Sequence, residues 1–179
     1  MHKNIKALLA TSALFFAGHS IADPGCGFEE NQEGFMATCK QEKQEVILTG
    51  VVEGHKLVTE LPPFMSGYKD YQVDTDSIAP IKAVTTPTEI VVIIGTWCPD
   101  CHRETPRFIR IMEAVNNPNI KVKFIGVDRK KQDPEGLAAQ YDFKRIPTFM
   151  VIQDGKEIGR IVERPTESLE KDLAKIFSK

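Results

Sequence analysis

The stretch GTWCPDCHRETP, residues 95–106, decides which fold and which chemistry this sequence can have. It holds Cys98 and Cys101, which are separated by two residues and followed by a charged run with helical character. Residues 89–96, EIVVIIGT, form a continuous β-branched run just before it, which is typical of a strand buried on both faces. The cysteine pair is therefore predicted to lie where a buried strand ends and a helix begins.

The start of a helix would give Cys98 a specific chemistry. Pro99 suits the first helical position, because its missing N–H would be unpaired there anyway. The free N–H groups of the first turn and the helix dipole favour a thiolate at Cys98. Cys101 lies one turn further on, shielded beneath it. We predict that Cys98 is the nucleophile that attacks a disulfide and that Cys101 resolves the mixed disulfide.

Two neighbours are expected to act on this thiolate in opposite directions. The Asp100 carboxylate opposes a thiolate at Cys98, whereas His102, when protonated, favours it. The sequence leaves open which of the two effects is larger.

Zinc binding and a permanently oxidised structural disulfide are the alternatives for the cysteine pair. A zinc site needs two more ligands at suitable spacing, but the sequence holds no second C-x-x-C, and His102 adjoins Cys101 too closely. A helix N-terminus favours redox use over a structural role. We expect no metal and no cofactor.

The rest of the chain from residue 89 predicts an α/β domain with the element order β-α-β-α-β-β-α. The first βαβ unit would pair two strands in parallel, and the last two strands would be antiparallel. The expected elements after the first strand are a helix from the cysteines to about residue 116, a strand at 120–128, a short helix at 134–141 capped by Asp133, strands at 147–153 and 158–163 joined by a tight turn, and a helix after Pro165 capped by Thr166.

Residues 1–22 have the pattern of a secretory signal peptide. A basic start precedes an apolar run at 7–17, and small residues occupy positions 20 and 22. The apolar run is shorter than the roughly 20 residues that a membrane-spanning helix needs. We expect cleavage after Ala22, export to the periplasm and no membrane anchor in the mature chain. An ordinary N-terminal helix is the alternative.

Residues 23–64 are expected to form a β-rich N-terminal extension. The runs at 46–52 and 56–61 predict a hairpin around Glu53-Gly54. Residues 65–88 are predicted to be a connector with a short helix near 76–84, capped by Asp74 or Asp76.

Cys26 and Cys39 precede the predicted hairpin. Disulfides form and persist in exported proteins, so we expect these two cysteines to form a structural disulfide. A second redox pair that exchanges with Cys98 and Cys101 is the alternative.

The segment WCPDC, residues 97–101, resembles the active site of the thioredoxin superfamily. Pro106 sits where that family has its helix-kinking proline, and the RIPT segment at 145–148 resembles the loop that holds the family's cis-proline. The DGK segment at 154–156 and Gly159 resemble its last hairpin. The resemblance covers residues 89–177 and is particularly close to a poorly characterised bacterial branch of thioredoxin-like proteins.

The resemblance implies a thioredoxin fold, a central mixed sheet flanked by helices, behind the N-terminal extension. It implies thiol–disulfide oxidoreductase activity. Within the site, it implies substrate contacts from Trp97, Ile146 and a cis Pro147, and tuning of the cysteines by Pro99, Asp100, His102 and Glu104.

One position departs from the family pattern. Thioredoxins carry a buried aspartate, a proton acceptor, six residues before the first active cysteine, and this chain has Val92 there. Proton transfer at Cys101 would then use Glu89, Glu104, Asp128 or water.

The resemblance and the composition together suggest the partners. The chain is 41% hydrophobic and 27% charged, and its net charge of -2 gives no reason to expect nucleic acid or an anionic membrane. Protein disulfides would be the substrates, and a membrane-bound or other extracytoplasmic thiol reductant would supply electrons. An oxidase, an isomerase and a non-catalytic binding or chaperone module are the alternatives.

Overall fold

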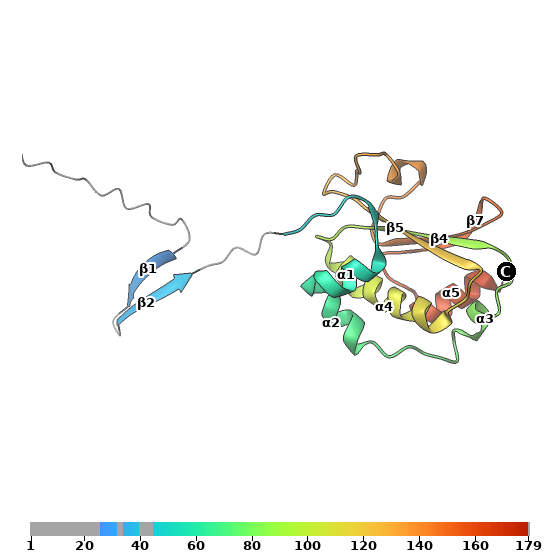
Figure 1. Cartoon of the computed structure of the whole chain (residues 1–179), viewed down its shortest axis with the longest axis horizontal. Coiled ribbons are helices and arrows are strands. Elements are labelled where there is room, and N and C mark those ends of the chain that lie inside the picture. The colour runs from blue at the N-terminus through green and yellow to red at the C-terminus, as the bar shows by residue number, and fades with distance from the viewer. Residues whose placement is uncertain (1–25, 32–33, 40–44, 179) are drawn as a thin grey trace, which may run out of the picture. The chain divides into compact units, whose positions relative to one another are not determined.

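The computed structural model describes residues 26–31, 34–39 and 45–178 (Figure 1). The chain divides into two compact units, residues 1–44 and 45–179, and each is described here by itself. The predicted signal peptide at 1–22 lies outside the described residues. Within the described ranges, no helix is long and apolar enough to span a membrane.

The first unit contains a two-stranded antiparallel sheet of β1 (Cys26–Asn31) and β2 (Gly34–Cys39). Its register places Cys26 directly opposite Cys39. Directly opposed residues of antiparallel strands have Cα atoms about 4.5–5.5 Å apart, which is a separation that a disulfide can span. The backbone pairing is therefore compatible with the predicted disulfide.

The second unit is built on a five-stranded mixed sheet with the order β3-β5-β4-β6-β7. The central strand β4 pairs with β5 in parallel and with β6 antiparallel, and the two outer pairs are antiparallel. The bounds are β3 (Gly50–Val52), β4 (Thr88–Ile94), β5 (Ile120–Gly126), β6 (Thr148–Gln153) and β7 (Lys156–Val162). The predicted strands from residue 89 onward and the mixed sheet are thus confirmed.

Figure 1 shows the helices on one side of the sheet and the long β5–β6 connection on the other. The helices are α1 (Gly54–Glu60), α2 (Pro62–Asp70), α3 (Ala79–Lys82), α4 (Pro99–Val115) and α5 (Leu169–Phe177). Phe108 of α4 packs on the sheet, with its ring centroid 6.2 Å from Phe124 and 5.0 Å from Phe149. This packing holds the middle of α4 against the sheet.

The predicted hairpin at 46–61 is wrong. Only β3 is a strand, and residues 54–60 form α1, which buries Leu57 and Val58. Gly54 allows this turn into the helix, because a Cβ there would lie 2.6 Å from Phe124 Cε2. Residues 45–64 therefore belong to the same unit as the cysteine pair and are not part of a separate extension.

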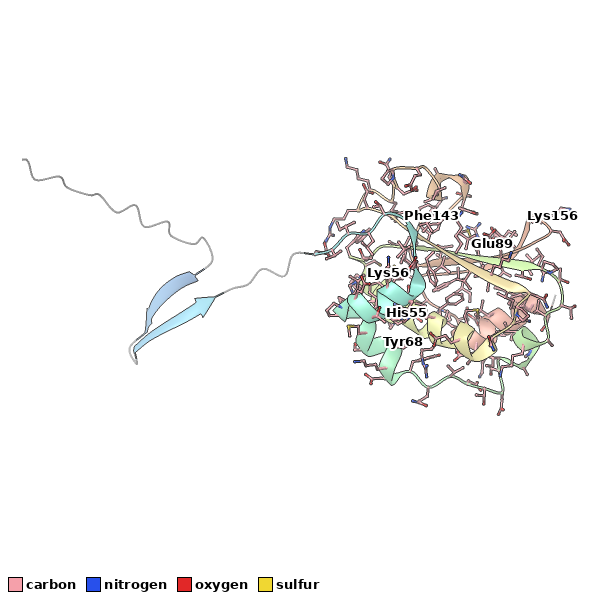
Figure 2. The ribbon with its side chains drawn as sticks, in the orientation of Figure 1. His55, Lys56, Tyr68, Glu89, Phe143 and Lys156 are labelled. Carbon is pink, nitrogen blue, oxygen red and sulfur yellow. The ribbon has the colours of Figure 1, made fainter. Side chains whose placement is uncertain are left out.

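The predicted connector is also more ordered than expected. Pro62 begins α2, which packs on α4, and the short helix near 76–84 is confirmed as α3. The hydroxyl of Tyr68 in α2 (labelled in Figure 2) donates a hydrogen bond to the Glu113 carboxylate in α4 at 2.8 Å. Asp74 does not cap α3; its carboxylate accepts hydrogen bonds from Ser77 instead.

Two further details differ from the prediction. The segment 134–141 holds only a short 3₁₀ turn, Ala138–Gln140, since Gly136 adopts φ +66° and interrupts a helix. Asp133 still accepts the backbone N–H groups of Leu137 and Ala138. The cap of α5 is Ser168 rather than Thr166, because the Ser168 hydroxyl accepts from the Lys171 N–H.

Candidate active site

Cys98 is the N-cap of α4 and has an extended backbone (φ -92°, ψ 123°). Its N–H donates to the Gly95 carbonyl at 3.0 Å, which closes the turn between β4 and α4. Pro99 occupies the first helical turn, as predicted. The Cys98 side chain is 8% exposed, whereas Cys101 is fully buried. Both are unbonded thiols in this structure.

The environment of Cys98 favours its thiolate. A hydrogen bond from the Cys101 side chain contributes most and lowers the pKa of Cys98 to about 6; the backbone N–H groups of Cys101 and Asp100 add to it. Burial and the Asp100 charge act in the opposite direction but are outweighed. A large fraction of Cys98 is therefore the nucleophilic thiolate at neutral pH.

Cys101 has the opposite acidity. Burial is the main cause that raises the pKa of the Cys101 thiol well above its ordinary value, and the hydrogen bond to Cys98 raises it further. The Gly95 N–H donates to Cys101 Sγ at 3.3 Å and offsets part of this effect. The geometry thus gives the two sulfurs different roles, with Cys98 ionised and Cys101 holding its proton.

Asp100 is half-buried in the first turn of α4, and two arginines neutralise its charge. Arg103 Nη2 lies 2.8 Å and Arg164 Nη2 lies 3.1 Å from Asp100 Oδ1. Burial raises the pKa of Asp100, but the guanidiniums outweigh burial and hold that pKa below its ordinary value. Arg164 comes from the segment after β7, so this pair also ties the C-terminal part of the unit to the site.

His102 is engaged with the backbone of the loop before Cys98. Its Nε2 lies 2.6 Å from the Thr96 carbonyl oxygen, and because a carbonyl only accepts, Nε2 is the donor. The Phe64 ring packs edge-on against His102 at 5.0 Å. The expected stabilisation of the thiolate by His102 is not among the main causes that set the Cys98 pKa. The structure places His102 instead as a support for the Thr96 backbone.

Thr96 connects the site to the segment that leads into β3. Its hydroxyl donates to the Val46 carbonyl at 2.6 Å and accepts from the Leu48 N–H at 3.1 Å. Sequence reasoning missed this contact, because its partners are about fifty positions apart in the chain.

The residues predicted to contact substrate do surround Cys98. The Ile146–Pro147 peptide bond is cis, and Cys98 Sγ lies 3.6 Å from the Ile146 carbonyl oxygen. Trp97 Nε1 donates to the Val127 carbonyl at 3.0 Å, which fixes the indole beside Cys98. Gly95 permits this arrangement, since a Cβ there would lie 2.8 Å from both Ile146 Cδ1 and Trp97 Cε2.

The three acidic residues considered for proton transfer differ in burial. Glu89 is exposed, and the Asp128 carboxylate accepts the N–H groups of Lys130 and Gln132 within its own loop. Glu104, one turn after Cys101, is 2% exposed and pairs with Arg103 through Oε1, while Oε2 has no hydrogen-bond partner. Val92 is fully buried in β4.

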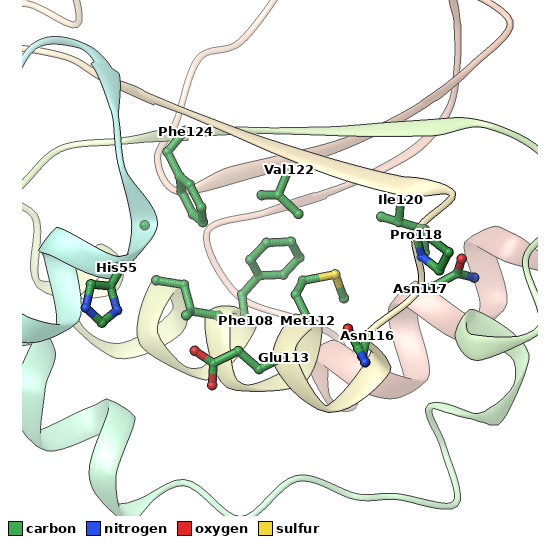
Figure 3. A pocket seen from close by; sticks show the side chains of 12 residues that line it. His55, Phe108, Met112, Glu113, Asn116, Asn117, Pro118, Ile120, Val122 and Phe124 are labelled. Carbon is green, nitrogen blue, oxygen red and sulfur yellow. The ribbon is translucent and has the colours of Figure 1, made fainter.

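The cysteines lie apart from a cavity in the same unit and, in the part of the chain that the structure describes, from any metal-ligand cluster. Within residues 26–31, 34–39 and 45–178, no three His, Cys, Asp or Glu side chains cluster as metal ligands would. A cavity of about 640 Å³ lies between α1, α4 and β5, with Phe108, Met112 and Phe124 among its lining residues and His55 near its edge (Figure 3). Its lining includes no residue of the WCPDC segment, so the cavity is separate from the thiol site.

The fold and the site define a dithiol protein in which a reactive cysteine caps a helix opposite a cis-proline loop. A family model described as Thioredoxin matches residues 63–174, which is more than half of the chain. The chain therefore belongs to the thioredoxin family, whose members are thiol–disulfide oxidoreductases. The match begins before residue 89 because α2 and α3 are part of the domain.

Individual relatives agree with this assignment. Rabbit (Oryctolagus cuniculus) thioredoxin is 31% identical over 88 residues, which cover 49% of this chain and 78% of that protein. The TPR repeat-containing thioredoxin TDX of Arabidopsis thaliana is 29% identical over 98 residues, which cover 54% of this chain but only 24% of that longer protein. A crystal structure of a Pseudomonas aeruginosa protein of unknown function shares the fold, with a TM-score of 0.51, 19% identity, and coverage of 70% of this chain and 86% of that one.

Proposed function

We propose that this protein is an exported thiol–disulfide oxidoreductase that reduces disulfides of extracytoplasmic proteins. The observation that carries the proposal is the opposite acidity of two neighbouring thiols at the start of α4. The Cys98 pKa is lowered to about 6, and the Cys101 pKa is raised.

The reaction begins when the Cys98 thiolate attacks one sulfur of a substrate disulfide. A bond forms between Cys98 Sγ and that sulfur, and the other substrate sulfur leaves as a thiolate that takes up a proton. Cys101 then loses its proton and attacks Cys98 Sγ, so the mixed disulfide breaks. The substrate leaves with two thiols and two more electrons, and the protein keeps a Cys98–Cys101 disulfide.

The surroundings of Cys98 fit the binding of a polypeptide substrate. Trp97 adjoins Cys98 and is fixed by its bond to the Val127 carbonyl, and the Ile146 carbonyl beside the cis Pro147 lies 3.6 Å from Cys98 Sγ. For the proton of Cys101, Glu104 is the only buried carboxylate among Glu89, Glu104 and Asp128.

The acidity of Cys98 favours the reducing direction. An attacking cysteine has a pKa of about 7 in thioredoxin and about 3.5 in a strongly oxidising relative of the same fold. The value of about 6 for Cys98 is closer to the first. A reductase outside the cytoplasm needs a source of electrons, and we assign that role to a membrane-bound or other extracytoplasmic thiol reductant.

Export rests on the signal-peptide pattern of residues 1–22 and on the opposed positions of Cys26 and Cys39. The expected mature protein begins at Asp23 and is released with the periplasmic fraction. N-terminal sequencing of the fractionated protein tests this part, and an intact residue 1 in the cytoplasmic fraction would contradict it.

The test of the activity is the reduction of insulin disulfides with dithiothreitol as the electron source. The wild-type protein should accelerate reduction, and Cys98→Ser should return the rate to that of dithiothreitol alone. Cys101→Ser should accumulate a covalent adduct with substrate, visible by mass spectrometry without reductant. Full turnover by both variants, with native circular dichroism, would instead support a non-catalytic binding module.

A further inference from the structure

Three consecutive cations follow β5 on the side of the site where Trp97 lies. The Arg129 guanidinium carbon lies 5.2 Å from the centroid of the Trp97 ring, and Arg129 pairs with Glu45 at 2.5 Å. Lys130 and Lys131 come next and are exposed. Trp97 is the residue before Cys98, so the Arg129 guanidinium lies against a side chain that adjoins the nucleophile in the chain.

A second cationic segment precedes the cis-proline and is bonded to the first. Lys131 Nζ donates to the Lys144 carbonyl oxygen, which joins the two loops. Lys144 and Arg145 are exposed and lead directly into Ile146, whose carbonyl lies 3.6 Å from Cys98 Sγ. The two loops therefore form a continuous basic edge around one side of Cys98, which we call the basic rim: Arg129, Lys130, Lys131, Lys144 and Arg145.

The positive charge of the basic rim is only partly neutralised. Arg129 pairs with Glu45 and Arg145 with Glu163, and the Asp128 carboxylate accepts N–H groups of its own loop. Within residues 45–178, Lys130, Lys131 and Lys144 form no ion pair. The whole chain has a net charge of -2, and Lys130, Lys131 and Lys144 are exposed cations on the two loops beside the site.

We propose that the basic rim makes this protein selective for disulfides carried on acidic polypeptide segments. This inference rests on the proposed function, because it names the substrate class of the same site. A segment whose cystine reaches Cys98 must lie beside Trp97 and the Ile146 carbonyl, and its flanking side chains then meet Lys130 and Lys144. Opposite charge in this position speeds encounter and suppresses the wrong partners.

The experiment uses three peptides that share one disulfide and differ only in flanking residues, which are aspartate, serine or lysine. At low ionic strength, the wild-type protein should form its mixed disulfide about tenfold faster with the acidic peptide than with the basic one. Added salt should narrow that ratio, because it screens exposed charges.

Two matched charge-reversal variants separate the basic rim from overall charge. Lys130→Glu/Lys144→Glu reverses two charges of the basic rim. It keeps the hydrogen bond from Lys131 Nζ to residue 144, because that bond is to the backbone carbonyl oxygen. Lys121→Glu/Lys156→Glu makes the same change in net charge far from the site, since both residues are exposed and lie at the opposite end of the sheet from Cys98 (Lys156 is marked in Figure 2). The rim variant should lose or reverse the preference for the acidic peptide, and the control variant should keep it.

The serine-flanked peptide distinguishes failure of this inference from failure of the proposed function. If no peptide reacts with wild-type protein, the oxidoreductase proposal itself is wrong. If all three react equally, or if both double variants keep the preference, the basic rim does not select substrates. Binding to vesicles with anionic phospholipid that is lost only in the rim variant, with peptide preference unchanged, would overturn the inference in favour of a membrane surface.

Discussion

The backbone N–H of Gly95 donates a hydrogen bond to the Cys101 sulfur at 3.3 Å. This bond gives the buried resolving thiol a polar partner, and it comes from the same residue that leaves space for Ile146 and Trp97. Gly95 therefore bonds to the resolving cysteine and also allows the Ile146 and Trp97 side chains to approach the site closely.

Gly95→Ala should damage stability and activity together. The new Cβ would lie 2.8 Å from Ile146 Cδ1, and we expect a loss of about 1–3 kcal/mol in the free energy of unfolding. Gly159→Ala is the matched control, because its Cβ would lie 2.9 Å from Ile176, away from the cysteines. Urea titration should show comparable losses for both variants, whereas insulin reduction should fall only for Gly95→Ala. Equal activity in the two would show that the approach of Ile146 and Trp97 does not matter for turnover.

The alkylation rate of Cys98 should follow its thiolate. The rate of reaction of the reduced protein with iodoacetamide should rise with pH through a midpoint near 6, because the Cys98 pKa is lowered to about 6. A midpoint near the ordinary thiol value of 9 would contradict the hydrogen bonds that we assign to Cys98.

The charge balance at Asp100 should move this midpoint in a predictable direction. Asp100→Asn keeps the backbone N–H but removes the charge that raises the Cys98 pKa, so the midpoint should fall. Arg164→Gln removes a partner of Asp100, so the midpoint should rise. Arg145→Gln is the control, since Arg145 pairs with Glu163 instead. If Arg145→Gln moves the midpoint as far as Arg164→Gln does, the Asp100–Arg164 ion pair does not specifically set the pKa of Cys98.

The same pKa predicts how the stability of the reduced protein depends on pH. An acid whose pKa is lower in the folded state stabilises that state fully above the unfolded pKa, here about 9, and this stabilisation is lost as pH falls through the folded pKa. The free energy of unfolding of the dithiol form should therefore decrease from pH 9 to pH 6 more in the wild type than in Cys98→Ser. Urea titrations of both proteins at pH 6 and pH 8.5 measure the difference. Parallel pH profiles would mean that the thiolate is not stabilised by folding.

We predict that Cys26 and Cys39 are oxidised to a disulfide, in line with the export that we propose. Cys26 and Cys39 are directly opposed in β1 and β2, and backbones paired in this way are close enough for a disulfide to join them. Intact mass of the purified protein, alkylated without reduction, should show these two cysteines unmodified. Cys26→Ser/Cys39→Ser should leave the potential of the Cys98–Cys101 pair unchanged if the first pair is structural. A changed potential would support the alternative of a second redox pair.

Local signals were sufficient to predict the elements that carry the site. The β-branched run before Gly95 and the proline at the first helical position each depend on neighbours in the sequence, and the structure has β4 and α4 where these signals place them. The cis bond before Pro147 followed from the family resemblance.

The contacts that tune the site could not be predicted, because they join distant positions. Arg164 reaches Asp100 across 64 positions, and Thr96 contacts Val46 across 50. Residues 56–61 were misassigned for a related reason: their pattern suits a strand, but burial of Leu57 and Val58 in the core favours a helix. Tertiary packing decides such short segments, since local propensity is weak.

The reduction potential of the Cys98–Cys101 couple is the measurement that bears most directly on this protein as a reductase. It is obtained by equilibrating the protein with defined ratios of reduced and oxidised glutathione and counting its thiols. We predict a value near that of thioredoxin, about -270 mV. A value near about -120 mV, which is typical of a strong oxidant, would contradict the reducing role and make the protein a disulfide donor.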